Sequence, residues 1–314
     1  MMPVDIEIHH LQVGQYTNNV QILSVEQPSN IEPVLCPMCD GTVKRALPVL
    51  SLKKQSYQQR IIDLLSTVKE NECINRSLKV PICILLPQVY ELTEKINLKL
   101  FEEILKLIPG LSQAKDCSLF PYGRSAMLLA WEKIERLFLD ESHQEILILA
   151  VDSDYRLFSQ ISKEWGSASE DIASESIIIA SIKKSEFGLS REWASYELRT
   201  SDQAESIAME FMFRQFKKEK ALPIHQFYAP FDEAGVQVNE WMSAYPCLFP
   251  SVGKHTEIIM TTPFTGDLGA CSGLYNLLHL NECYRQEKYL HNTMQLEISP
   301  RLYRAAAFYT WQEK

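Results

Sequence analysis

Glycine is scarce in this sequence: 11 of the 314 residues are glycine, about half of the roughly 7% that is usual. Glycine lets a backbone adopt positive φ angles and approach a ligand closely, so few loops of that kind are expected and each is informative. Long apolar runs are missing as well. None reaches the roughly 18–20 residues that a membrane span needs, so no transmembrane helix is predicted.

Basic charge is also limited. The chain carries 31 Lys and Arg against 40 Asp and Glu, a net charge of −9, and a nucleic-acid partner is not expected because no basic stripe is visible. The first ten residues, MMPVDIEIHH, lack a basic segment followed by an apolar stretch, so no secretory signal is predicted. Eight cysteines do not make a disulfide scaffold in so long a chain, and a reducing, cytoplasmic location is predicted.

Apolar periodicity predicts alternating strands and helices. Strand-like runs occupy 5–13, 79–86, 145–151, 176–182, 224–229, 257–261, 293–298 and 302–311. Helical spacing occurs at 55–70, 94–108, 125–139, 201–220, 236–244 and 267–281, whereas 14–50 is expected to be irregular. Each half of the chain then reads βαβαβα followed by a strand. Such alternation predicts parallel sheets covered by helices on both faces, an α/β fold with an internal duplication.

One segment is specific to a family. Residues 266–274 read GDLGACSGL after the strand EIIMT, which resembles the Gly-His-x-x-Ala-Ala-Ser/Gly-Gly-Leu stretch of the β-ketoacyl synthases. Tyr122-Gly123-Arg124-Ser125, before a helix, resembles the nucleophile elbow of that family. Residues 174–179 resemble the segment that opens its second half. Together these similarities cover roughly residues 120–282.

The resemblance to the β-ketoacyl synthases implies a thiolase-like fold. We expect two similar βαβαβα halves, residues 1–165 and 166–314, packed as one compact domain in five layers, α-β-α-β-α. The resemblance also implies a homodimer, because proteins of this fold extend their central sheets across a twofold axis. Acyl carrier protein, acyl-CoA or an intact ketosynthase are the other partners that it suggests.

The residues that carry out condensation in this family are absent. Family members use a Cys at the start of a buried helix, where the helix dipole and desolvation favour a thiolate. Two His residues then assist decarboxylation and stabilise the developing oxyanion. Here the elbow carries Arg124 and Ser125, and Asp267 stands at the last His position. An anionic carboxylate cannot donate a hydrogen bond to an oxyanion.

The position of the middle His stays open between two alignments. Aligning on the strand IHQFYA places Ala229 or Pro230 there, and this is the alignment that we favour. Aligning on His225 instead recovers the family's Pro five residues later, as Pro230. The diverged site positions are therefore Arg124, Ser125, His225 and Asp267, and none is assigned a catalytic role.

Arg124 and Asp267 are predicted to form an ion pair. In the resembling enzymes both positions lie at helix starts and face each other across a buried pocket. A lone buried charge costs several kcal/mol, so we expect the two side chains to approach within about 4 Å. The simpler interpretation of Asp267 is a helix cap, because an Asp at a helix start satisfies free N–H groups.

No cofactor and no metal site are predicted. Cys36-Pro-Met-Cys39 is a single CxxC without a second pair at zinc spacing, and only His9 and His10 could complete it. The remaining histidines are expected to lie singly and to form no cluster; they are His143, His255, His279 and His291.

The sequence thus favours a ketosynthase-like protein without the Cys-His-His residues, noncatalytic or diverged, that binds a partner or an acyl ligand. One alternative is an active acyltransferase that uses Ser125 or His225 and transfers acyl groups other than aminoacyl groups. The other is a partner of an intact ketosynthase, as a chain-length factor is.

Overall fold

Two sets of five strands, arranged in the same order, form the framework of the chain. The structure is a computed structural model that describes residues 2–24, 31–38, 41–76, 80–88, 94–140, 143–158, 172–200, 206–232 and 234–313. The strand order is β5-β4-β6-β7-β1 in the first set and β10-β9-β11-β12-β8 in the second. The two sets join at one residue pair, Val4 of β1 with Leu189 of β8.

The directions of the strands match as well. In the first set β5, β4 and β6 are parallel and β7 and β1 follow antiparallel. In the second set β10, β9 and β11 are parallel and β12 and β8 follow antiparallel. Each strand of one set therefore has a counterpart in the other, which is the internal duplication that the element order predicts.

The strands have the following bounds: β1 Val4–Val13, β2 Val34–Pro37, β3 Val43–Leu47, β4 Ile82–Leu85, β5 Cys117–Phe120, β6 Glu145–Ser153, β7 Ala173–Lys184, β8 Gly188–Leu198, β9 Gln226–Tyr228, β10 Glu257–Ile259, β11 Thr293–Ile298 and β12 Tyr303–Gln312. The α-helices are α1 Asn19–Leu23, α2 Tyr57–Ser66, α3 Glu72–Arg76, α4 Glu94–Leu107, α5 Ala126–Leu139, α6 Ile207–Glu219, α7 Val236–Ala244, α8 Thr262–Thr265 and α9 Ser272–Arg285. Two short 3-10 turns, η4 Gly123–Ser125 and η7 Gly269–Cys271, precede α5 and α9.

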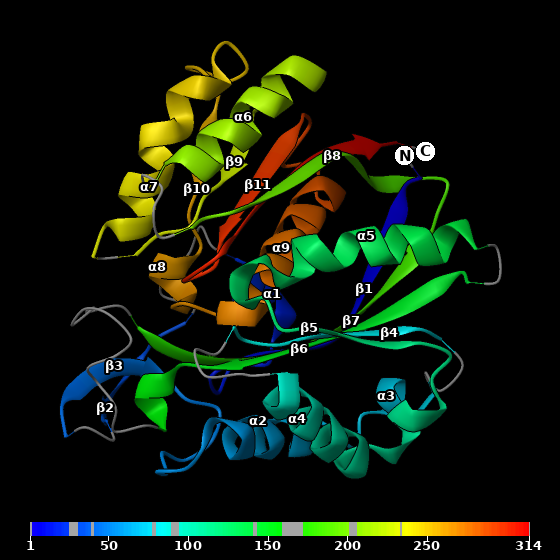
Figure 1. Cartoon of the computed structure of the whole chain (residues 1–314), viewed down its shortest axis with the longest axis vertical. Coiled ribbons are helices and arrows are strands. Elements are labelled where there is room, and N and C mark those ends of the chain that lie inside the picture. Colours follow the sequence, from blue (N-terminus) through cyan, green and yellow to red (C-terminus); the bar gives the residue numbers. More distant parts are fainter. Residues whose placement is uncertain are drawn as a thin grey trace.

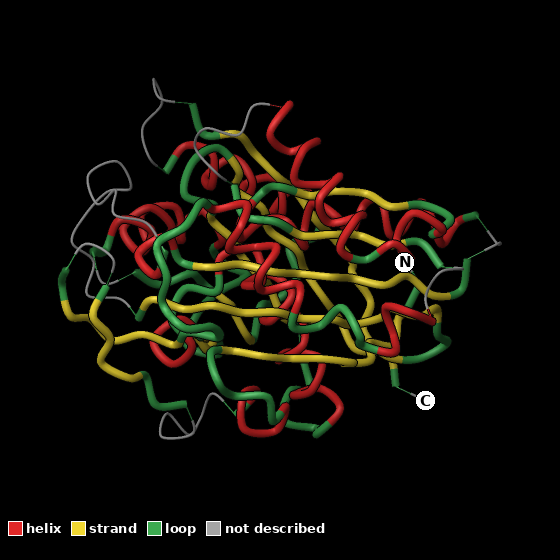
Figure 2. The backbone as a smooth tube through the Cα atoms, turned by 90° about the horizontal axis from the view of Figure 1, so that it is seen from below, coloured by secondary structure: helices red, strands yellow, loops and turns green. Residues whose placement is uncertain are grey.

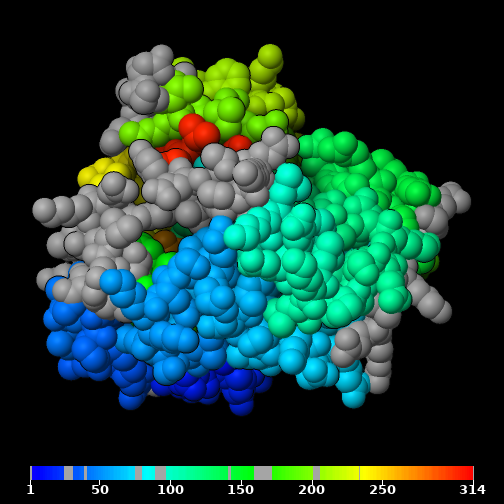
Figure 3. All heavy atoms as spheres, turned by 60° about the horizontal axis from the view of Figure 1, so that its bottom comes forward, coloured from blue at the N-terminus to red at the C-terminus, as the bar shows by residue number. Residues whose placement is uncertain are grey.

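Helices and sheets alternate in five layers (Figure 1). α5 and α9 lie between the two sheets and form the largest apolar core with both of them. α2 and α4 cover the outer face of the first sheet, which is the surface toward the viewer in Figure 3, and α6 and α7 cover the second. Figure 2 shows the strands crossing the molecule with helices on both sides. The predicted α-β-α-β-α arrangement is confirmed.

The strand predicted at 176–182 does not have the predicted place in the fold. That strand, β7, was expected to open the second half. It pairs instead with β6 and β1, and in chain order it is the fifth strand of the first set. The second set instead begins with β8, which was not predicted, because GLSREWASYEL interleaves charged and apolar residues. We propose on this basis that the halves divide between Lys184 and Gly188, not at residue 165.

The segment at 14–50, expected to be irregular, contains α1 and the hairpin of β2 with β3. β3 also pairs with the start of β7, through Ala46 and Ala173. Within the described ranges, every helix falls short of the length and hydrophobicity that a transmembrane span requires.

Candidate functional site

Two helix starts meet in the central layer. β5 leads through η4 into α5, and η7 leads into α9, so that η4 and η7 contact each other. Gly273, in the first turn of α9, makes the close approach feasible, because a Cβ atom there would lie 2.8 Å from the carbonyl oxygen of Arg124. Gly123 has φ +58°, which lets the chain turn sharply from β5 into the helix.

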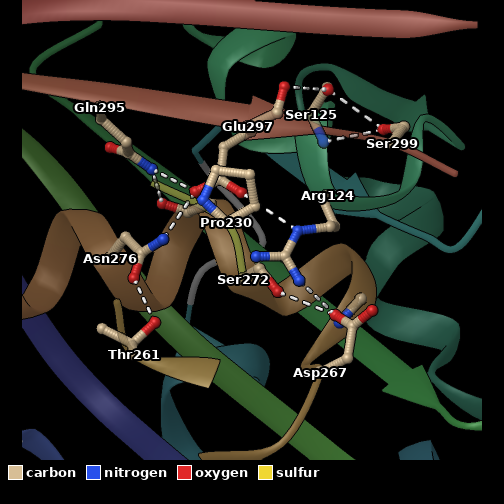
Figure 4. A network of polar contacts seen from close by, with 12 residues as sticks. Arg124, Ser125, Pro230, Thr261, Asp267, Ser272, Asn276, Gln295, Glu297 and Ser299 are labelled. Atoms are coloured by element: carbon tan, nitrogen blue, oxygen red, sulfur yellow. Dashed lines mark hydrogen bonds and ion pairs between the residues drawn. The ribbon is translucent and has the colours of Figure 1, made fainter. Parts of the chain in front are cut away.

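The predicted ion pair between these helix starts is present (Figure 4). Arg124 Nη1 donates to Asp267 Oδ1 at 2.6 Å. The side chain of Arg124 is 1% exposed, whereas that of Asp267 is 35% exposed. The guanidinium is thus buried between the helices, and its partner reaches toward solvent.

Glu297 of β11 is a third member of this cluster that the sequence did not indicate. Its Oε2 lies 3.5 Å from Arg124 Nε, and its side chain is fully buried. Its Oε1 accepts hydrogen bonds from Asn276 Nδ2 at 2.7 Å and from Gln295 Nε2 at 2.9 Å. β11 reads TMQLEI, and its alternating polar residues are the signal that could have pointed to a polar cluster in a buried strand.

The charges in this cluster perturb one another. Burial alone would lower the pKa of Arg124, but the carboxylates of Asp267 and Glu297 raise that pKa above its ordinary value. Burial raises the pKa of Glu297, and Arg124 opposes that rise. The cluster therefore keeps the guanidinium charged in a place from which water is excluded.

Ser125 is buried and occupied with structural hydrogen bonds. Its N–H donates to Ser299 Oγ at 3.1 Å, and its hydroxyl lies 3.3 Å from the carbonyl oxygens of Glu297 and Tyr303. Ser299 Oγ in turn donates to the carbonyl of Tyr122. None of the hydrogen bonds described for Ser125 involves an imidazole that could take its proton.

Asp267 is not the N-cap that the simpler interpretation predicts, because the N-cap residues of η7 and α9 are Leu268 and Cys271, but its carboxylate satisfies one backbone N–H group of η7. Its Oδ1 accepts a hydrogen bond from Gly269 N at 2.9 Å. Asp152, at the end of β6, accepts hydrogen bonds from Ala270 N at 2.5 Å and Ser153 N at 2.6 Å. Burial raises the pKa of Asp152, although these N–H groups oppose the rise. Gly269 is needed here, because a Cβ would overlap the Asp152 carboxylate and φ is +51°.

The loop after β9 lies beside the Arg124 cluster. Figure 4 shows Pro230 beside Glu297 and Arg124. His225 lies before β9, five residues from Pro230, a distance on the order of 16 Å along an extended chain. The alignment of the middle His position on Ala229 or Pro230 stays a proposal.

His225 belongs to a histidine cluster that was not expected. Its ring centroid lies 5.3 Å from that of His255 and 4.4 Å from that of His291. The three residues precede β9, β10 and β11, and parallel strands bring their starts together at one edge of a sheet. Burial and the two neighbouring histidines lower the pKa of His225. The expectation that His255 and His291 lie singly was wrong.

Cys117 and Cys271 form no contact described for the Arg124 cluster. Burial raises the pKa of Cys117, in β5, to about 11, and burial also raises the pKa of Cys271 in η7. Cys36 lies in β2, whereas Cys39 is outside the described residues. His9 and His10 bond to Ser181 and Gln12. In the part of the chain that the structure describes, no group of three His, Cys, Asp or Glu residues could hold a metal ion.

The fold is that of the ketosynthases. A PfaC ketosynthase–chain length factor matches at TM-score 0.65 with 11% identity, over 100% of this chain and 43% of that one. The ishigamide ketosynthase/chain length factor matches at 0.61 with 12% identity, over 98% and 99%. A type II polyketide ketosynthase in complex with its acyl-carrier protein matches at 0.59 with 10% identity, over 99% of both chains.

No family model matches the sequence, and no curated protein matches it either. At identities of 10–12%, the structural matches establish the thiolase-like ketosynthase fold and leave activity to the site itself.

Proposed function

We propose that this chain is a ketosynthase-fold protein that does not condense acyl chains and that acts by binding a partner protein or an acyl ligand. The proposal rests on the ion pair of Arg124 with Asp267, at the positions where the resembling enzymes carry their nucleophile and last histidine. A protonated guanidinium offers no lone pair to attack a thioester. An ionised carboxylate accepts hydrogen bonds and cannot stabilise an oxyanion.

The position of Ser125 supports the same proposal. A serine becomes nucleophilic when an adjacent base takes its proton, and the oxygen atoms around its hydroxyl are two backbone carbonyls and another serine hydroxyl. We infer that Ser125 holds the start of α5 against β11 and does not form an acyl-enzyme.

A partner protein is favoured by an open strand edge. β5 pairs with β4 on one side, and among the described residues no strand lies on its other side. Such an edge is suited to pairing with a strand of another chain. We propose a homodimer or, as in the ketosynthase and chain-length-factor proteins of similar fold, a pair with an intact ketosynthase. A cytoplasmic location stays a prediction.

Acyl transfer to the protein tests the proposal directly. The purified chain is incubated with malonyl-CoA, with acyl-CoA and with acyl-loaded acyl carrier protein, and its intact mass and the release of CO2 are followed. We expect no added acyl mass and no decarboxylation above the rate without protein. An intact ketosynthase with its elbow Cys serves as the positive control.

If the chain were instead an acyltransferase, an acyl group would be found on the protein. An acyl adduct on the wild-type chain that disappears in Ser125→Ala, while Ser272→Ala retains it, would overturn the noncatalytic proposal. The homodimer is tested separately by sedimentation, which should give twice the 36.1 kDa mass of the chain at micromolar concentration; a monomer would contradict it.

A further inference from the structure

The second sheet leaves part of a strand edge open. β8 pairs with β12 from Gly188 to Leu198 but with β1 at Leu189 alone. On the side away from β12, residues 194–198, here called the β8 edge, have no strand partner within the described ranges. Alternate residues of such a stretch turn their N–H and C=O groups outward, where a further strand can bind at about 4.8 Å.

A groove of about 510 Å³ lies along this edge, and Figure 1 shows β8 between α5 and α6. α5 lines one side of the groove with Leu128, Leu129 and Glu132, and α6 lines another with Phe211 and Gln215. β8 and its neighbour β12 contribute the rest, including Arg191, whose guanidinium is already paired with Glu135 of α5. The open edge is thus set in a groove with helices on two sides, which gives an incoming segment more than backbone hydrogen bonds to contact.

The side chains of the β8 edge alternate between these two helices. Ala194 packs against the central core, whereas Ser195 Oγ donates to Gln215 Oε1 of α6 at 2.9 Å. The period of two then directs Tyr196 toward α5 and Glu197 toward α6. Tyr196 is 54% exposed and Phe211 is 60% exposed, so both aromatic rings are accessible to an incoming segment.

Glu197 supplies the charge that selects an occupant. Its carboxylate is half-buried, and no Lys, Arg or His side chain within the described residues forms an ion pair with it. Burial without such a partner raises its pKa. The edge itself reads ASYEL and contains no base, so a second copy of the edge would bring no cation to Glu197. A segment of opposite charge is the favoured occupant.

We propose that the β8 edge binds an extended segment of a partner protein as an added antiparallel strand. A Lys or Arg of the segment lies opposite Glu197, with its methylene stem on Phe211, and an apolar residue lies opposite Tyr196. Main-chain hydrogen bonds supply affinity, and the alternation of basic and apolar residues supplies specificity. This inference goes beyond the noncatalytic proposal and does not depend on it, because the groove is built apart from the Arg124 cluster.

A blocked octapeptide of alternating Lys and Val, labelled with a fluorophore, is the probe. We expect saturable binding in fluorescence anisotropy and slower hydrogen exchange of the amides at 194–198. Two N-methylated forms of the peptide test the geometry. In one the Lys amides are methylated and in the other the Val amides, so that one form cannot bond to β8 and loses at least tenfold in affinity, while the other binds as before.

Charge reversal tests the specificity. Glu197→Lys should weaken binding of the Lys–Val peptide at least tenfold and favour a Glu–Val peptide. Glu186→Lys, an exposed change of the same charge in the turn before β8, should leave both affinities unchanged, and thermal unfolding verifies that both variants are folded.

Three results would overturn the proposal. They are equal binding by the two methylated peptides, unchanged preference in Glu197→Lys, and protection of the β8 edge that rises with protein concentration when no peptide is present. The last result would identify a second copy of the chain as the occupant. None of these outcomes bears on acyl transfer, so the proposal fails or stands separately from the noncatalytic function.

Discussion

The two halves of the chain each bury an ion pair at the start of the fifth strand, with the charges exchanged. In the first half, Arg60 of α2 donates two hydrogen bonds to Glu175 of β7, at 2.6 and 2.9 Å. In the second half, Arg304 of β12 donates two to Glu240 of α7, at 2.7 and 2.9 Å. All four side chains are buried. Each half therefore has a buried ion pair at the start of its fifth strand in chain order. β7 supplies the carboxylate in the first half, and β12 supplies the guanidinium in the second.

The pair between the halves differs from these two. Arg124 makes one hydrogen bond to Asp267, and its Nε has no hydrogen-bond partner among the described residues, although Glu297 Oε2 lies 3.5 Å away. The fifth-strand pairs are bidentate, a geometry that adds energy and fixes orientation. The pairs inside each half are therefore held by two charge-assisted hydrogen bonds, whereas the pair between the halves is held by one.

Removing the arginine of the pair at β7 or β12 should cause the largest loss in the free energy of unfolding. Arg60→Met and Arg304→Met each leave a buried carboxylate without its cation, which costs about 3–5 kcal/mol in the free energy of unfolding. Urea unfolding measures the loss. Arg214→Met, which removes an exposed pair with Glu210, is the control and should change stability by less than about 0.5 kcal/mol. A large loss of unfolding free energy in only one of the two variants would show that the two pairs are not equivalent.

Asp267→Ala should cost less, about 1–2 kcal/mol. Its carboxylate is partly exposed, and Glu297 remains near the guanidinium to compensate its charge. The same urea experiment measures this loss and compares a pair held by one hydrogen bond with a bidentate pair. A loss as large as that of Arg60→Met would show instead that the two kinds of pair are equivalent.

The two central helices also differ, and pH should reveal the difference. The buried side chains of α5 are apolar, whereas α9 buries His279, and burial lowers the pKa of His279 to about 4. The unfolded chain has a His pKa near 6.5, so it binds a proton that the folded chain excludes. The contribution of neutral His279 to stability is present above about pH 6.5 and is lost as the pH falls toward 4.

We therefore expect His279→Gln to lose less stability than the wild type between pH 7 and pH 5, as measured by urea unfolding at each pH. Met127→Leu in α5 should keep the wild-type pH dependence. If the glutamine variant and the wild type gave the same slope, His279 would not be the group that titrates.

Much of the fold could be predicted because apolar runs and helical spacing survive in the sequence. The helix at 236–244 and the strand at 293–298 have the bounds that periodicity gave them. β8 was not predicted, because a strand at an open edge keeps polar side chains and its pattern lacks the continuous apolar run of a buried strand. The bounds of that element depend on its pairing with β12, which is distant in sequence.

The ion pair of the site was predictable because the resemblance to the β-ketoacyl synthases places Arg124 and Asp267 at helix starts that face one buried pocket. The cost of burying one charge alone then predicts that the two side chains pair. Glu297 and the cluster of His225, His255 and His291 could not be found in this way. Each depends on which strands become neighbours, and linear spacing does not contain that information.

At Leu189, β8 lies between the first and the last strand of the chain, β1 and β12. Leu189 pairs with Val4 on one side and with Trp311 on the other, so the start of β1 and the end of β12 lie two strand spacings apart, about 10 Å. A short linker could join them. A circular permutant opened in the turn at 185–187 would then keep every strand pair while the second half is synthesised first.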